Sequence, residues 1–112
     1  MNWTPLQSED QIQALHQQSF EHPVLVFKHS TRCSISATAL SRFERNYTQA
    51  QPTNSIIPYY LDLIRFRPLS NRLAAEYEVE HQSPQVLVIS EGRVVYTASH
   101  FDISATEALA KV

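Results

Sequence analysis

The fold of this chain is decided by one stretch, Val24-Leu25-Val26-Phe27-Lys28-His29-Ser30-Thr31-Arg32-Cys33-Ser34-Ile35-Ser36. Its first four residues are apolar without alternation, which predicts a short strand covered on both faces. A polar loop follows, and from Ile35 onward apolar residues recur at helical spacing, which predicts a helix over 34–48. A buried strand that leads into a helix opens a βαβ unit, whose two strands should be parallel and whose crossover should be right-handed.

Working outward, the same reading predicts three more strands and three more helices. Ser8 and Gln11 form a capping-box pattern at the start of a helix over 8–20, whose apolar face includes Phe20. Pro58 indicates an edge position or a bulge in the second strand. The further elements are a loop over 51–54, a strand over 55–64, a helix over 68–78, strands over 86–89 and 93–97 joined by a tight turn at Glu91-Gly92, and a last helix capped by Ser104.

The predicted order is therefore α-β-α-β-α-β-β-α in a single domain over residues 1–112. A parallel βαβ unit followed by an antiparallel hairpin gives a four-stranded mixed sheet with helices on both faces. This α/β layout is that of the thioredoxin fold.

Composition excludes several kinds of site. The chain has one glycine, Gly92, so it has neither a Gly-rich phosphate loop nor a dinucleotide fingerprint. It has one cysteine, Cys33, which excludes an internal disulfide, a four-cysteine zinc site and a C-x-x-C pair. The five histidines lack zinc-type spacing, so we expect no metal site.

The charge and hydropathy of the chain indicate where in the cell the protein is expected and which classes of partner it does not bind. The net charge of −2 and the lack of a recognition motif argue against nucleic-acid binding. No apolar run approaches the roughly 18 residues of a membrane helix, and the N-terminus does not resemble a secretory signal. We therefore expect a cytoplasmic, monomeric protein that binds neither membranes nor nucleic acid.

Cys33 is the candidate nucleophile. It follows a predicted strand and precedes a helix, and the positive end of a helix stabilises a thiolate. Lys28, His29 and Arg32 lie just upstream and could add positive charge. The alternative is that Cys33 is a small apolar core residue in a non-catalytic binding module. A thiolate at neutral pH would favour the enzyme, and an unreactive thiol would favour the module.

Three segments, 27–36, 62–71 and 81–87, resemble the monothiol bacilliredoxin family of bacteria that make bacillithiol. The resemblance covers nearly the whole chain in the same order. In the motif Cys33-Ser34-Ile35-Ser36, Ser34 replaces the family's proline, and Ser36 stands where dithiol relatives have a resolving cysteine. The departure at Ser34 affects the first helical turn and so the activation of the thiol.

The resemblance implies a thiol–disulfide oxidoreductase. Cys33 would remove bacillithiol, or a similar low-molecular-weight thiol, from mixed disulfides on client proteins, and an external thiol would then release it. No tightly bound cofactor is implied. The bond Ser83-Pro84 would be cis and would lie opposite Cys33, where Ser83 pairs with the bound partner. A monothiol peroxidase or an iron–sulfur carrier remains an alternative, which peroxide consumption or a coloured reconstituted cluster would reveal.

Basic residues concentrate around this site. Residues 28–72 hold seven of the nine Lys and Arg residues but two of the eleven Asp and Glu residues. Arg65 and Arg67 follow a strand end and suit the carboxylates of bacillithiol, whereas Arg42 and Arg45 lie mid-helix and are expected to be plain surface. After the last strand, His100 and Asp102 could hold the polar part of the thiol, or could belong only to a turn.

Overall fold

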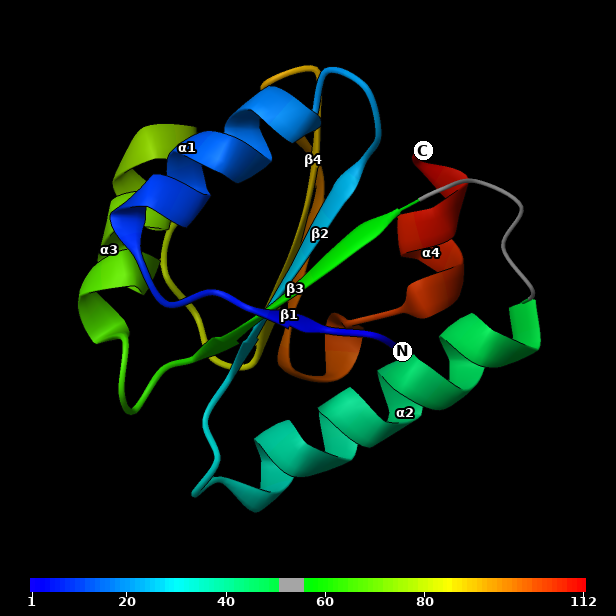
Figure 1. Cartoon of the computed structure of the whole chain (residues 1–112). Helices are drawn as coiled ribbons and strands as arrows, with labels where there is room; N and C mark the ends of the chain where they lie inside the picture. The colour runs from blue at the N-terminus through cyan, green and yellow to red at the C-terminus, as the bar shows by residue number, and fades with distance from the viewer. Residues whose placement is uncertain (51–55) are drawn as a thin grey trace.

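Strand β2 (Val24–His29) is buried along its whole length and lies in the middle of a five-stranded mixed sheet (Figure 1). The computed structural model describes residues 1–50 and 56–112. The remaining elements, in chain order, are β1 (Thr4–Pro5), α1 (Glu9–Gln18), α2 (Ser34–Ala50), β3 (Ile57–Asp62), α3 (Arg67–Tyr77), β4 (Gln85–Ser90), β5 (Arg93–Ser99), a 3-10 turn η1 (His100–Asp102) and α4 (Ala105–Ala110).

The strand order is β1-β3-β2-β4-β5. β2 pairs with β3 in parallel, and β4 pairs antiparallel with both β2 and β5, which confirms the predicted βαβ unit and terminal hairpin. The predicted count of four strands is wrong. Strand β1, only two residues long, adds to the β3 edge through the register Thr4 with Tyr59 and Pro5 with Tyr60. Two residues carry no periodicity, so no sequence pattern indicates this strand.

Pro58 occupies a position that needs no backbone donor. The N–H of Ile57 donates to the carbonyl of Pro23 at 2.9 Å, so the nitrogen of the next residue, Pro58, faces away from β2. On that side β1 pairs only with Tyr59 and Tyr60. The proline therefore behaves as an edge residue within a strand that has two neighbours, as its sequence context suggested.

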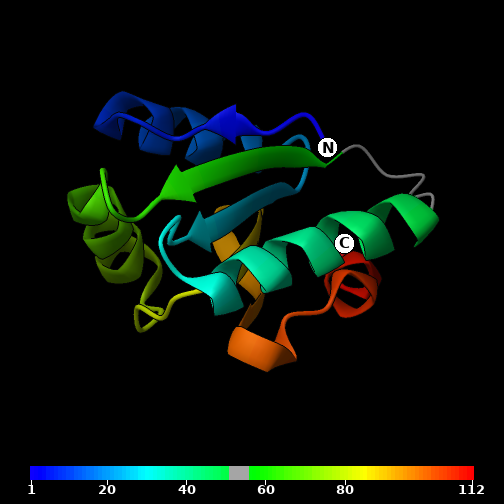
Figure 2. The same ribbon diagram turned by 90° about the horizontal axis from the view of Figure 1, so that it is seen from below.

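Helices cover both faces of the sheet. Helices α1 and α3 cover one face and α2 and α4 cover the other, as Figure 1 and the view from below in Figure 2 show. Side chains of β2 alternate between the two cores, with Val24 and Val26 on the α1/α3 side and Leu25 and Phe27 on the α2/α4 side. This alternation places successive residues at the end of β2 on opposite faces.

Some predicted boundaries differ from the structure. Helix α1 ends at Gln18, so Phe20 leaves the expected apolar face and is 57% exposed. The predicted loop over 51–54 and the predicted first strand residue, Ser55, lie outside the described residues. Among the helices of residues 1–50 and 56–112, none combines the length and the apolar character needed to cross a bilayer.

Candidate active site

Cys33 lies immediately before α2 and begins the helix with its own backbone. Its carbonyl accepts a hydrogen bond from the N–H of Ala37 at 3.0 Å, and its N–H donates to the carbonyl of Ser30 at 3.1 Å. The residue is partly buried. Amides of a first helical turn have no acceptor within the helix and carry partial positive charge, and a partly buried sulfur beside them can still be reached by another sulfur.

Ser36 joins the start of α2 to the end of β2. Its side chain is fully buried, and its Oγ accepts a hydrogen bond from the N–H of Ser30 at 3.1 Å. The same oxygen lies 2.6 Å from Nδ1 of His29. The hydroxyl thus fixes the loop that carries Cys33. At the place where dithiol relatives would have a second thiol, this chain has a residue that shapes the site.

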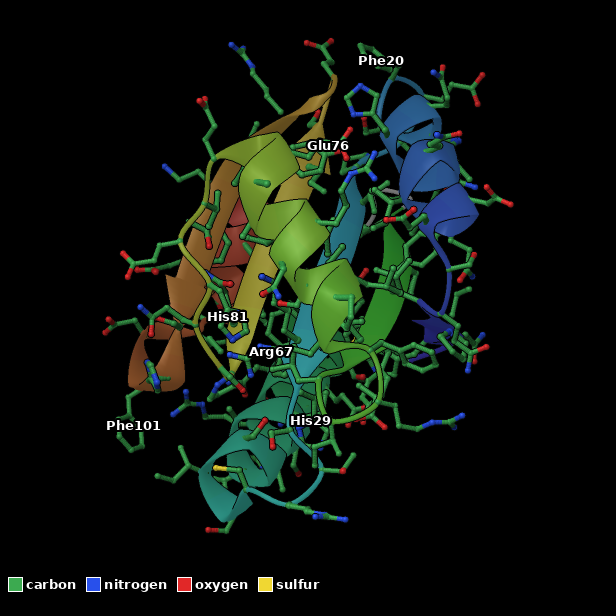
Figure 3. All side chains as sticks on the ribbon, turned by 90° about the vertical axis from the view of Figure 1, so that its left-hand side faces the viewer. Phe20, His29, Arg67, Glu76, His81 and Phe101 are labelled. Atoms are coloured by element: carbon green, nitrogen blue, oxygen red, sulfur yellow. The ribbon has the colours of Figure 1, made fainter. Side chains whose placement is uncertain are left out.

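His29 does not supply the positive charge that its sequence position suggested. It is buried on the α2 side of β2, beside Ser36 (Figure 3). Burial lowers the pKa of His29 below the ordinary 6.5, and the nearby Asp62 carboxylate opposes this only in part. At neutral pH the imidazole is therefore uncharged, and its role is to hold Ser36.

Lys28 faces away from the helix that carries Cys33. In the sheet it pairs with Leu61 and Gln85, and Leu61 belongs to the core on the α1/α3 side. Cross-strand partners share a face, so the Lys28 side chain lies beneath α3. The sequence position of Lys28 suggested a role in activating the thiol, but the register of β2 places its side chain on the other face of the sheet.

A hollow of about 150 Å³ lies between the start of α2 and η1, and Ser34, the residue after Cys33, is part of its lining. Two exposed apolar side chains are part of its lining, Ile35 at 48% exposure and Phe101 at 76%. Its lining residues are Ser34, Ile35, Thr38, Ala39, Arg42, His100 and Phe101. An apolar hollow at the start of α2 can receive the carbon skeleton of a small ligand or of a peptide segment.

Arg42 has a function at this hollow that sequence reasoning missed. Its Nη2 donates to the carbonyls of Phe101 at 3.4 Å and Ile103 at 3.2 Å. The arginine thereby ties the third turn of α2 to the segment after β5 and is not plain surface. The partners lie about 60 positions away in the chain, and helical spacing alone carries no signal for such a contact. Arg45, one turn further on, is exposed, as expected.

The residue before β4 is hydrogen-bonded to His100, which is one of the residues that line this hollow. The Ser83–Pro84 peptide bond is cis, and the Pro84 carbonyl accepts a hydrogen bond from the N–H of His100 at 3.0 Å. Pro84 is buried and Ser83 is partly exposed. The contact of this bond with the Cys33 sulfur stays a prediction.

The other expected binding residues are exposed side chains around this end of the molecule. His100 and Asp102 lie on η1. Arg65 lies in the connection from β3 to α3, with its guanidinium 5.2 Å from the centre of the Phe66 ring. Arg67 begins α3, and Arg32 lies in the loop before Cys33. Across residues 1–50 and 56–112, His, Cys, Asp and Glu side chains form no group of three or more suited to a metal ion.

Comparisons with known proteins agree with this architecture. The family model of the monothiol bacilliredoxin BrxC matches residues 4–108. A solved structure described as a candidate oxidoreductase with a thioredoxin fold is 32% identical, with a TM-score of 0.78 and coverage of 95% of this chain and 88% of the other.

Two thioredoxins are similar in fold alone. The thioredoxin of Malassezia sympodialis is 12% identical, with a TM-score of 0.69 over 97% of this chain and 86% of that one. Thioredoxin f of spinach chloroplast is 16% identical, with a TM-score of 0.70 over 96% and 83%. The family match and the 32% identical oxidoreductase support a thiol redox function. The chain belongs to the monothiol bacilliredoxin family and has the thioredoxin fold.

Proposed function

We propose that this protein removes bacillithiol, or a similar low-molecular-weight thiol, from mixed disulfides on client proteins, with Cys33 as the nucleophile. The observation that carries the proposal is the placement of Cys33: a partly exposed thiol at the first turn of a 17-residue helix, with its loop fixed by Ser36. Family membership supports the same chemistry.

The reaction is two successive thiol–disulfide exchanges. The Cys33 thiolate attacks the bacillithiol sulfur of the mixed disulfide, the old S–S bond breaks, and the client sulfur leaves as a thiolate that takes a proton from water. Cys33 then carries the bacillithiol. A second low-molecular-weight thiolate attacks the bacillithiol sulfur and frees Cys33, and the two small thiols leave as a disulfide. The number of disulfide bonds is the same after each step.

The chain's own residues account for the monothiol form of this mechanism. Cys33 is the one cysteine of the sequence, so its mixed disulfide cannot close into an internal disulfide. Ser36 occupies the neighbouring turn with an alcohol that is already hydrogen-bonded. We propose that release therefore depends on an external thiol, with bacillithiol as co-substrate and without a resident cofactor. S-thiolated cytoplasmic proteins would be the clients, each handled by a monomer.

The test is transfer from a defined substrate. A client peptide that carries bacillithiol in a mixed disulfide is mixed with the protein, and free peptide and Cys33 adduct are followed by mass spectrometry. We expect release of peptide thiol together with an adduct on Cys33. Cys33→Ser should abolish both at unchanged circular dichroism, because the change removes the nucleophile with little change in volume. Release by Cys33→Ser at the wild-type rate would show that the catalytic assignment is wrong.

A further inference from the structure

A buried ammonium group lies on the other face of the sheet from Cys33. The Lys28 side chain is fully buried, and its Nζ has no hydrogen-bond partner among the residues that the structure describes. Removing a charged amine from water without a partner is costly. Burial, together with the positive charge of Arg67, lowers the pKa of Lys28 from 10.5 to about 8. At neutral pH the group therefore remains mostly protonated despite this cost.

Two further basic groups gather around Lys28. Arg67 is the first residue of α3, and His81 lies in the connection from α3 to β4. Figure 3 shows their side chains near each other at the N-terminal end of α3. Burial and the charges of Lys28 and Arg67 lower the pKa of His81 below the ordinary 6.5. We call Lys28, Arg67 and His81 the basic cluster.

The surroundings of the basic cluster add to its positive potential. The N-terminus of α3 lies here, and the residue before the helix, Phe66, makes no side-chain capping bond. Ser70, buried in the first turn, has its Oγ 2.8 Å from Nδ1 of His81 and so holds the imidazole in place. In the described part of the chain, the ion pairs are those of Arg72 with Glu9 and Glu76, so neither supplies a counter-charge to the cluster.

We propose that the basic cluster binds a carboxylate of the low-molecular-weight thiol that Cys33 exchanges. This inference rests on the proposed function and names the part of the protein that would recognise the thiol. The exposed Arg67 guanidinium offers a planar fork for two hydrogen bonds to a carboxylate, and His81 lies next to it. Lys28 lies beneath them, where the low dielectric of the interior makes its charge act more strongly than in water.

The position of the cluster suits a ligand whose sulfur is at Cys33. Lys28 is the last residue but one of β2. The loops that follow β2 and β3 lie at the same end of the molecule (Figure 1). A thiol bonded to Cys33 on the α2 side would cross the end of the sheet to reach Arg67 at the start of α3. The bound anion would also offset the mutual repulsion of the Lys28 and Arg67 charges.

The first experiment compares two substrates that differ in the carboxylate. The same peptide is prepared as a mixed disulfide with bacillithiol and with cysteamine, and kcat/KM is measured for both. We expect the wild-type protein to prefer the bacillithiol substrate by about tenfold or more. Arg67→Gln and Lys28→Met should each bring that ratio close to one, whereas Arg45→Gln, which removes an exposed charge from α2, should keep it.

A second experiment detects binding without turnover. The Cys33→Ser protein is titrated with malate, and the imidazole NMR signal of His81 is followed against pH, with sodium chloride at equal ionic strength as the control. Malate should raise the pKa of His81 and chloride should not. This measurement decides the matter even if Lys28→Met fails to fold.

The outcomes separate the two proposals. If the wild-type protein releases both thiols equally well and malate leaves His81 unchanged, the inference is wrong while the proposed function stands. If it releases neither thiol, the proposed function itself is wrong.

Discussion

At the scale of the residue, Ser36 shows how a position associated with redox chemistry serves structure in this chain. Its hydroxyl satisfies the Ser30 N–H and meets His29, and all three groups lie between the end of β2 and the start of α2. A second thiol here would give up that bonding in exchange for an internal disulfide. The chain instead has a loop whose shape is held by hydrogen bonds and whose sulfur depends on outside partners.

The replacement Ser36→Ala should therefore destabilise the protein. It leaves the Ser30 N–H and the His29 ring nitrogen without their partner in a buried place, which costs about 1–3 kcal/mol. Urea unfolding followed by circular dichroism measures the free energy of unfolding. Ser41→Ala, on the exposed face of the same helix, is the matched control and should change it by less than about 0.5 kcal/mol. Equal effects of the two substitutions would contradict the role assigned to Ser36.

At the scale of the element, the β4–β5 hairpin has a turn that combines a suitable residue with an unsuitable one. Glu91 and Gly92 both have positive φ, 53° and 78°, as in the primed turns that match the twist of paired strands. Glycine adopts this conformation without penalty, whereas glutamate is strained. A Cβ on Gly92 would also lie 2.8 Å from Cζ of Phe20. The turn predicted from the sequence is confirmed. Its positive φ angles suit Gly92 better than Glu91.

Opposite effects are expected from the two substitutions in this turn. Gly92→Ala should lower the free energy of unfolding by about 1–2 kcal/mol, because alanine is strained at positive φ. Glu91→Gly should raise it by up to about 1 kcal/mol, since the strain at this position is relieved. Thermal unfolding of the two variants beside the wild-type protein gives the signs. A stabilising Gly92→Ala would show that the turn has another conformation.

At the scale of the whole molecule, the end of the sheet that carries Cys33 also carries a buried charge. On the α2 side of β2, burial lowers the pKa of His29, and on the α3 side the Nζ of Lys28 has no hydrogen-bond partner among the described residues. A methionine of similar length would bury its side chain at lower cost than Lys28 does. Costs of this kind are common at binding sites, where stability is exchanged for function.

The cost of Lys28 should appear as a pH dependence of stability. The folded pKa, about 8, lies below the ordinary 10.5, so between these values the unfolded chain holds a proton that the folded chain has lost. The penalty is full below pH 8 and disappears as the pH rises to 10.5. Lys28→Met should thus be more stable than the wild-type protein at pH 7, by on the order of 3 kcal/mol, and the pH-dependent part of this difference should vanish by pH 10.5.

Chemical unfolding at pH 7, 9 and 10.5 measures that difference, with Lys111→Met, a substitution of an exposed lysine near the C-terminus, as control. A difference between Lys28→Met and wild type that stays constant over this range would show that Lys28 bears no buried charge.

Local patterns were sufficient for the central part of the fold. The apolar run 24–27, the helical spacing after Ile35 and the Glu91-Gly92 turn depend on residues within a few positions of one another, so the parallel unit, the hairpin and the place of Cys33 before α2 were predictable. The exact ends of helices and strands were harder to predict, as the exposure of Phe20 beyond the end of α1 shows. The ends of helices and strands depend on capping residues and on spatial neighbours, which the spacing of apolar residues does not encode.

What only the tertiary structure decided depends on contacts between distant segments. The sequence alone determined that Cys33 lies at a strand-to-helix junction, because strand, loop and helix are each specified by adjacent residues. Three contacts join residues more than about 35 positions apart in the chain. They are the pairing of β1 with β3, the hydrogen bonds from Arg42 to the segment after β5, and the approach of Lys28 to Arg67 and His81. Such meetings follow from the register of strands and the packing of helices across the sheet, and periodicity along one segment carries no information about which distant side chain will lie opposite.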